Sequence, residues 1–549
     1  MIDKMNSLST ALENTKYLKK ATFIILALAL ILYDTLQYRS GHTLTYLLHD
    51  SDQQAYFYIF LQKLLPSIFN DETTKGFWFN HGKTTMLIWK AFYSPIHFLG
   101  GSAFTSVAIL STTLRLLYLY SLYFLNKAAK LPLSHLIIAG GLSIVYFVKY
   151  GINSSIPGSS AVPHDIALIF SPFVFGLSFK AYKENSEYWK YAYAIASISN
   201  IFHPSFPPFL VASCFTLHFF SADKTSKSFK FLLISILYFL LSSFCFGYLD
   251  QFLNFTNKEQ VVLSPNLIEI MDFIYVWRNG LDFFERFINA KLFQIPIIVL
   301  TLIFLKKNKT HRPFIILMGT FLLIAVIDFI GQSKQLIELS GTNVFSKISY
   351  YAMCTKEIYF INILGLIGIS YIIEMIINNI VKQKQTRVLL AFIVSTTLVI
   401  NLGYWKISPP IGTQEVQATK YFGKSNILID RFKNNNDLFI VYPPQSDNGL
   451  ALGLYLNKKI YIGKHFLWNI LNPNKKKQLL KRYQLSKKLY DSKLAEDVRI
   501  DTLDKIRSSI NNAPFLFYSK NNINNENYEL IDSKAGINLY LSKSKNVLK

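Results

Sequence analysis

Long apolar runs, separated by short polar or basic stretches, dominate the chain between residues 21 and 404. A helix needs about 20 mostly apolar residues to cross the hydrocarbon core of a bilayer. The pattern therefore predicts about eleven transmembrane helices, the shortest of which need a thin bilayer or extra flanking residues. They are expected at Ala21–Gln37, Ala103–Leu125, Leu133–Tyr150, Ala161–Tyr182, Tyr188–Phe202, Pro204–Ser221, Ser228–Tyr248, Phe293–Leu305, Pro313–Gly331, Glu357–Val381 and Val388–Tyr404.

Basic residues between the apolar runs predict the orientation of the helices. Lys16, Lys19 and Lys20 place the N-terminus in the cytoplasm under the positive-inside rule. Alternation then makes residues 38–102 the first outer loop, provided that Thr84–Leu99 is a re-entrant or surface helix rather than a span. The remaining inner connections are the basic ones, Asn126–Lys130, Lys183–Glu187, Ala222–Lys227, Lys306–Arg312 and Lys382–Arg387.

The composition changes after residue 404 to that of a soluble domain. Short strands are expected at Asp437–Tyr442, Lys459–Ile462, Pro514–Tyr518 and Ile537–Leu541, and helices at Lys475–Ser492 and Asp501–Ile510. Strands that alternate with helices are typical of a small α/β domain. The predicted fold class is thus an α-helical polytopic membrane domain over residues 1–404, followed by an extracytoplasmic α/β domain over residues 405–549.

Overall composition supports a membrane protein and removes one class of partner. The chain of 549 residues is 51% hydrophobic, and its mean hydropathy is +0.26. A formal charge of +24 is typical of nucleic-acid binding. Because many of the lysines and arginines lie in loops between apolar runs, we assign them to membrane orientation and expect no nucleic-acid partner. The three cysteines lack metal-ligand spacing and predict neither a disulfide framework nor a zinc site.

Acidic residues gather in the first outer loop, which is about sixty residues long. Asp50 and Asp52 follow the first apolar run, and Asp71 lies farther along the loop. Carboxylates held beside a membrane usually serve chemistry or transport. Asp52 also precedes an apolar, helically spaced segment, Gln53–Leu65, so a plain helix N-cap is the competing interpretation.

The stretch Asp52-Gln53-Gln54-Ala55-Tyr56 resembles the first-loop signature of the GT-C superfamily, the polytopic glycosyltransferases that use polyprenyl-phosphate-linked sugars. The general layout, with many spans, a large first outer loop and a C-terminal outer domain, is also similar. The resemblance implies that Asp52 deprotonates the acceptor hydroxyl, and that Asp71 matches a further acidic position. Gln53 departs from the pattern, in which a glutamate is usual. No internal sequence criterion decides whether Asp52 or Asp71 is the base.

A lipid-phosphate leaving group needs cationic neutralisation as charge develops. On the predicted outer face, Arg278 is the first candidate because arginine can hold phosphate in a bidentate fork, and Lys356 is a second. His203, at a His-Pro corner that resembles a cavity-lining position of GT-C members, and His164 are candidates for substrate binding with Asp50. Oxygen and nitrogen ligands are available for a divalent cation, but their spacing matches no metal motif. No metal ligand is assigned.

Two other functions compete with glycosyl transfer. A transporter or flippase for a lipid-linked or polar solute would show ionisable residues and broken helices near the middle of the membrane. Most acidic residues here lie at the predicted outer surface instead. Gln53 keeps open a third hypothesis, a catalytically silent scaffold. The expected partners are membrane lipid, a lipid-linked sugar donor, and a glycan, lipid or protein acceptor, and the expected location is a bacterial inner membrane.

Overall fold

The computed structural model describes most of the helical region and most of the C-terminal region. The described residues are 15–39, 51–74, 81–145, 161–184, 186–221, 225–247, 312–332, 357–407, 431–432, 434–444, 453–454, 456–463, 466, 473–491, 493–534 and 537–542. They form two compact units. Unit 1 draws on residues 1–43, 83–265 and 275–408, and unit 2 on residues 44–82, 266–274 and 409–549. Residues 51–74 of the first outer loop thus fold with the C-terminal region, whereas residues 83–102 of the same loop belong to unit 1.

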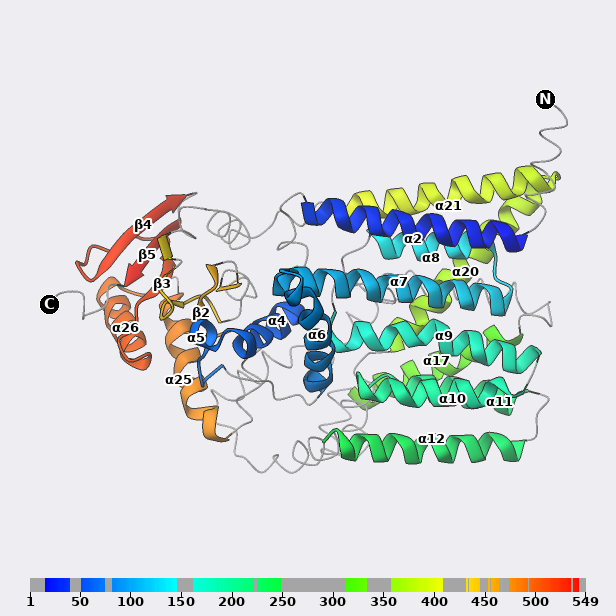
Figure 1. Cartoon of the computed structure of the whole chain (residues 1–549), viewed down its shortest axis with the longest axis horizontal. Coiled ribbons are helices and arrows are strands. Elements are labelled where there is room, and N and C mark those ends of the chain that lie inside the picture. Colours follow the sequence, from blue (N-terminus) through cyan, green and yellow to red (C-terminus); the bar gives the residue numbers. More distant parts are fainter. Residues whose placement is uncertain are drawn as a thin grey trace. The chain divides into compact units, whose positions relative to one another are not determined.

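Unit 1 consists of helices, most of which run side by side, with α6 lying crosswise to them (Figure 1). Helix α6 covers most of Thr84–Leu99, the segment predicted as a re-entrant or surface helix. The helices are α2 (Thr15–Arg39), α6 (His81–Phe98), α7 (Ala103–Ala129), α8 (Leu133–Val145), α9 (Pro163–Lys183), α10 (Tyr188–Ile198), η2 (Ser199–Ile201), α11 (Pro207–Phe219), α12 (Thr225–Cys245), α17 (Arg312–Gln332), α20 (Glu357–Ile380) and α21 (Lys384–Ile407).

Each predicted span coincides with a helix, except Phe293–Leu305, which lies outside the described residues. Among the described residues, α7, α9, α12 and α20 are long and apolar enough to cross a membrane. Helices α10 and α11 are shorter than the predicted runs, and the last five residues of the run predicted for α8 lie outside the described residues. The pair α10 and α11 is short because the chain tightens into η2 and then turns at Pro204, and because α11 starts on Pro207, whose missing N–H costs nothing in a first helical turn.

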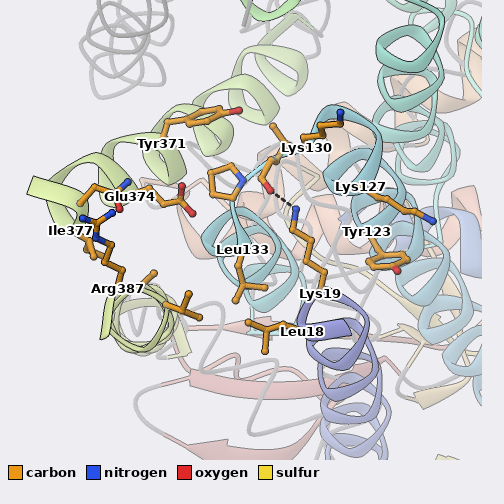
Figure 2. A pocket seen from close by; sticks show the side chains of 15 residues that line it. Leu18, Lys19, Tyr123, Lys127, Lys130, Leu133, Tyr371, Glu374, Ile377 and Arg387 are labelled. Carbon is orange, nitrogen blue, oxygen red and sulfur yellow. Dashed lines mark hydrogen bonds between the residues drawn. The ribbon is translucent and has the colours of Figure 1, made fainter. Parts of the chain in front are cut away.

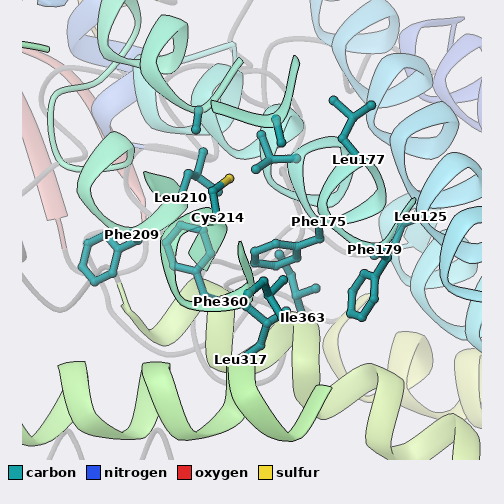
Figure 3. Close-up of a cluster of buried hydrophobic side chains, with 14 of the residues drawn as sticks. Leu125, Phe175, Leu177, Phe179, Phe209, Leu210, Cys214, Leu317, Phe360 and Ile363 are labelled. Atoms are coloured by element: carbon teal, nitrogen blue, oxygen red, sulfur yellow. The ribbon is translucent and has the colours of Figure 1, made fainter. Parts of the chain in front are cut away.

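Aromatic side chains from α9, α11, α17 and α20 form the core of unit 1 (Figure 3). Phe360 lies at its centre, with its ring stacked 5.1 Å from that of Phe321 and 5.2 Å from that of Phe209. A second close packing involves the glycine pair of α8. A Cβ at Gly140 would lie 2.8 Å from Leu26 of α2, and one at Gly141 would lie 2.9 Å from Val399 of α21. These glycines let α2 and α21 approach α8 closely.

One buried ion pair joins three helices of unit 1. Arg115 of α7 is fully buried and its Nη1 lies 2.6 Å from Asp34 Oδ1 of α2. Arg115 Nη2 also donates to the carbonyl oxygens of Ser143 and Ile144, at 2.6 and 2.7 Å, in the last turn of α8. Thr112 donates to the second Asp34 oxygen at 2.6 Å. Arginine at this depth must face protein or water, and here it satisfies a carboxylate and two main-chain carbonyls of α8.

Unit 2 contains a mixed sheet of five strands in the order β2-β1-β3-β5-β4. The three strands β2, β1 and β3 are parallel, whereas β5 pairs antiparallel with both β3 and β4. Its elements are α4 (Ser51–Leu64), α5 (Pro66–Phe69), β1 (Phe439–Ile440), β2 (Lys459–Ile460), α25 (Pro473–Leu489), α26 (Glu496–Ser509), β3 (Phe515–Ser519), β4 (Tyr528–Lys534) and β5 (Ile537–Ser542).

Alternating side chains of the strands supply two apolar layers. Phe515 and Phe517 face a cluster that includes Leu479 of α25 and Leu503 of α26, while Leu516 faces a second cluster on the other side of the sheet. The four predicted strands and both predicted helices are present. Strand β4 was not predicted from the sequence. It is an edge strand with an exposed Leu530 and a register shift near Asp532, so its residues do not alternate in hydrophobicity.

Candidate functional site

Helix α4 carries the proposed catalytic motif at its start. It begins at Ser51, so Asp52 is the second residue of the helix, and its backbone lies in the first turn rather than at the predicted N-cap. From Ala55 to Leu61 every side chain of α4 is buried. A helix that is apolar on all sides must be enclosed by protein or lipid. The segment that follows Asp52 is therefore enclosed on all sides and is not a one-sided surface helix.

Polar contacts lock α4 and the turn after it into unit 2. The backbone N–H of Ile460, in β2, donates to the Tyr58 hydroxyl at 3.0 Å. The ring of Tyr58 also meets Phe69 and Phe466 edge-on, each at 5.4 Å. Burial, reinforced by the nearby Asp71 carboxylate, raises the pKa of Tyr58 above its usual value. Tyr58 thus stays neutral and acts as a hydrogen-bonding strut between the first loop and the sheet.

Asp71 forms a buried, bidentate ion pair with Arg482 of α25. The Asp71 oxygens accept from Arg482 Nη1 at 2.6 Å and from Nη2 at 3.1 Å. Thr74 also donates to Asp71 Oδ2, at 3.1 Å, and Arg482 Nη1 donates to the Tyr461 carbonyl at 3.0 Å. The guanidinium lies over the Phe439 and Tyr461 rings, 5.7 and 5.1 Å from their centroids. These contacts hold the turn around Asp71 against α25, and both oxygens of the Asp71 carboxylate are bound by the Arg482 guanidinium.

The Asp71–Arg482 pair has a topological consequence. It buries residues that are 411 positions apart in the chain. Two segments in direct contact lie on the same side of a membrane that the helices cross. The first outer loop and the C-terminal domain therefore share one side, which is the relation that alternation of the basic loops predicts.

His164, Asp165 and His203 come together at one end of the helices of unit 1. His164 and Asp165 lie in the first turn of α9, and His164 Nε2 is 3.1 Å from Asp165 Oδ1. The side chains are only 9% and 3% exposed. The His203 ring, from the corner before α11, lies 6.5 Å from the His164 ring in an edge-to-face arrangement. Two histidines that the sequence places about forty residues apart thus face the same small region.

Hydrogen bonds define what these histidines can do. The backbone N–H of Ser205 donates to His203 Nδ1 at 3.2 Å, so a neutral His203 carries its proton on Nε2 and can donate from there. His164 Nε2 is buried and, within the described part of the chain, has no partner with hydrogen-bond geometry. Buried polar atoms without such a partner are uncommon and mark places where a ligand or water completes the bonding.

The remaining predicted site residues cannot be placed. Asp50, Arg278 and Lys356 lie outside the described residues. Over the described ranges, no group of three or more His, Cys, Asp or Glu side chains is arranged to hold a metal ion.

Sequence reasoning missed Arg482, although a signal was present. It is the single arginine of α25, whose other cations are all lysines. It also lies three residues after Leu479 and four before Ser486, both buried, and so on the inward face of the helix. A lone arginine on an apolar face predicts a buried carboxylate partner, because only the planar guanidinium pairs in a bidentate manner.

Comparisons with known proteins give likenesses to solved structures but no match by sequence. No protein-family model matches the sequence, and no curated protein matches it. Among solved structures, the chain is similar to the apo crystal structure of the Archaeoglobus fulgidus oligosaccharyltransferase, with 11% sequence identity and a TM-score of 0.48. The match covers 91% of this chain and 70% of that chain. At this level of similarity the likeness establishes neither an activity nor the role of any residue.

Proposed function

We propose that the protein is an integral membrane glycosyltransferase that moves a sugar from a polyprenyl-phosphate-linked donor to an acceptor on the extracytoplasmic face. The observation that carries the proposal is the buried His164 Nε2, without a hydrogen-bonding partner among the described residues, beside Asp165 and facing His203. These three side chains lie at the helix ends that alternation places on the side of the first outer loop. They offer hydrogen-bonding groups where a polar, phosphate-bearing substrate would enter.

Asp52 is the proposed base. In the transfer, the acceptor oxygen bonds to the anomeric carbon while the bond from that carbon to the phosphate oxygen breaks. The acceptor proton passes to the Asp52 carboxylate, and the polyprenyl phosphate leaves with the bonding electron pair. We assign this role to Asp52 rather than Asp71 because both oxygens of Asp71 are already bound to Arg482. Asp71 instead positions the segment that carries Asp52.

The histidines bind the substrate in this proposal. His203 donates from Nε2 to a phosphate or sugar oxygen, because its Nδ1 is occupied by the Ser205 N–H. His164 completes its bonding with a second substrate group. Asp50, Arg278 and Lys356 stay proposed binding residues, with Arg278 and Lys356 neutralising the leaving phosphate. A divalent cation stays a prediction, tested by adding a chelator to the same assay.

The test is transfer by the purified protein in lipid, with a panel of polyprenyl-phosphate sugars. We expect Asp52→Asn to lower turnover about 10²–10⁴-fold, the usual contribution of a general base. Asp501→Asn is the matched control, since it makes the same change at a half-exposed carboxylate on α26 and should leave turnover unchanged. Full turnover in a folded Asp52→Asn variant would place the base elsewhere. No turnover with any donor would favour the transporter or the silent scaffold.

A further inference from the structure

A basic pocket opens at the other end of unit 1 from the histidines. Its volume is about 630 Å³, within the range of small-ligand sites. It lies between the start of α2, the α7–α8 connection and the α20–α21 connection, as Figure 2 shows. By the alternation of the basic loops, all these helix ends are cytoplasmic. The pocket is therefore separate from the candidate active site and lies at a bilayer surface.

Four cations and one carboxylate line the pocket. They are Lys19 of α2, Lys127 and Lys130 at the end of α7, Arg387 of α21, and Glu374 of α20. Lys19 is held by the Leu131 carbonyl at 2.6 Å, and Arg387 Nε donates to the Val381 carbonyl. Lys127 and Lys130 are exposed and, within the described ranges, have neither an acidic nor a hydrogen-bonding partner for their ammonium groups. The pocket thus carries an excess of positive charge with two ammonium groups available to a ligand.

The backbone shape that presents Lys130 is built into the chain. Lys130 adopts a left-handed conformation, with φ of 58°, at the C-terminal cap of α7. Its N–H bonds to the Asn126 and Lys127 carbonyls, and the Asn126 side chain donates to the Pro132 carbonyl at 2.8 Å. A non-glycine residue in this region is uncommon and is held there by its surroundings. The two lysines therefore project from a fixed turn and not from a loose loop.

Apolar residues complete the lining and continue along the outside of the helices. Leu18, Ile377 and Val388 line the pocket itself. Next to them, Ile380 of α20 and Leu389 of α21 are 71% and 60% exposed. A small soluble anion has no use for such a surface, whereas the acyl chains of a lipid cover it. Cationic pockets between helices on the cytoplasmic side suit anionic headgroups.

We propose that this pocket binds the phosphate headgroup of an anionic phospholipid, with its acyl chains along α20 and α21. The proposal needs unit 1 to be embedded in a membrane but does not depend on the proposed transfer chemistry. Lys127 and Lys130 contact the phosphate, while Lys19 and Arg387, held by main-chain carbonyls, shape the pocket and add to its potential. Glu374 also lines the pocket and offsets part of its positive charge.

The test measures lipid binding to the full-length protein, stripped of lipid in a neutral detergent, by native mass spectrometry. Phosphatidylglycerol, phosphatidylcholine with the same acyl chains, and inorganic phosphate are the three probes. We expect phosphatidylglycerol to bind at least tenfold more tightly than phosphatidylcholine. The double variant Lys127→Gln/Lys130→Gln should weaken phosphatidylglycerol roughly tenfold, since two phosphate contacts are lost. The control Lys190→Gln/Lys230→Gln removes the same charge from exposed lysines at the ends of α10 and α12 and should change binding less than twofold.

Several results would overturn the proposal. Equal loss in the two double variants would show a general surface-charge effect, and phosphate displacing phosphatidylglycerol at similar concentration would show a free-anion site. If the first double variant does not fold, a photoreactive phosphatidylglycerol on the wild-type protein decides the question. Crosslinks to residues 123–133 or 371–391 support the site, and crosslinks confined to other helices reject it.

Discussion

The two units are each held by a buried arginine–aspartate pair, yet the pairs do different work. Arg115–Asp34 joins adjacent helices and spans 81 positions of the chain, while Arg482–Asp71 spans 411. Arg115 also donates from Nε and Nη2 to the main-chain carbonyls of Ser143 and Ile144 in α8. Arg482 binds both oxygens of one carboxylate and lies between two aromatic rings.

The comparison separates two uses of the same chemistry. In unit 1 the arginine satisfies a carboxylate and two main-chain carbonyls of α8, polar groups that need a partner inside a bilayer, so its value lies in joining three helices. In unit 2 the arginine holds the turn after α4 against α25, so its value lies in joining two segments that are far apart in the chain. Buried pairs are costly to break from one side, because the group that stays behind is left charged and unpaired. Each pair can therefore be tested by removing one partner and then both.

The largest effect is expected from Arg115→Met. The change leaves Asp34 charged and the Ser143 and Ile144 carbonyls without their donor, which we expect to cost about 5 kcal/mol, the upper end of the range for a broken buried pair. Hydrogen exchange measured by mass spectrometry should show faster exchange in α7 and α8 and an unchanged rate in α25 and α26. Unit-resolved exchange is needed because a chain of two units does not unfold in one step.

The matched variant for this pair is Arg115→Met/Asp34→Leu. With no charge left behind, it should recover most of the stability that Arg115→Met alone loses. An equal loss in both variants would show that the carbonyls at the end of α8, and not the ion pair, account for the effect.

A somewhat smaller effect, about 3 kcal/mol, is expected from Arg482→Met in unit 2. Asp34 and Asp71 each keep a threonine hydroxyl as a partner. Loss of Arg482 leaves one main-chain carbonyl, that of Tyr461, without this donor, whereas loss of Arg115 leaves two. Exchange should rise in residues 51–74 and in α25, while α7 and α8 keep their protection. Arg431→Met is the control, because Arg431 pairs with Glu529 at the surface and such pairs contribute less than about 1 kcal/mol. Protection of residues 51–74 that survives Arg482→Met would show that α4 burial alone anchors the loop.

Hydrophobic pattern predicted the elements of both units well. Apolar runs located most of the described helices of unit 1, and short apolar segments rich in strand-forming residues located β1, β2, β3 and β5, because buried positions are filled by apolar residues. Strand β4 was missed because it lies at the edge of the sheet with Leu530 exposed, and an edge strand does not need a regular pattern of apolar residues. The shortening of α10 and α11 was likewise hidden, since an apolar run continues through the His203-Pro204 corner without a change in hydrophobicity.

The placement of side chains was less predictable, for a different reason. His164 and His203 were picked out by residue type, but their meeting depends on how α9 packs beside α11. Asp71 was picked out as acidic, but its partner, Arg482, lies 411 positions away, and a single sequence does not show which distant residues are in contact. The assignment of the first loop to the C-terminal domain is of this kind, because it rests on Arg482 and Tyr58 rather than on any local pattern.

The smallest effect is a pH dependence that belongs to the Arg482 network. Burial raises the pKa of Tyr461 to about 12 from its ordinary value near 10, and its hydroxyl is 2.8 Å from Ser509 Oγ. Stability tied to a raised pKa is complete below the unfolded value and is lost as pH climbs toward the folded value, so the window is pH 10–12. At pH 11 the loss of stability should be about 1.4 kcal/mol.

The variant Tyr461→Phe tests this dependence. It should be about 1 kcal/mol less stable than wild type at pH 8, because it lacks the hydrogen bond. By pH 11 to 12 that difference should vanish and then reverse, as read from exchange in α25 and α26. A constant difference in stability across this pH range would show that the pKa of Tyr461 is no higher in the folded protein than in the unfolded chain.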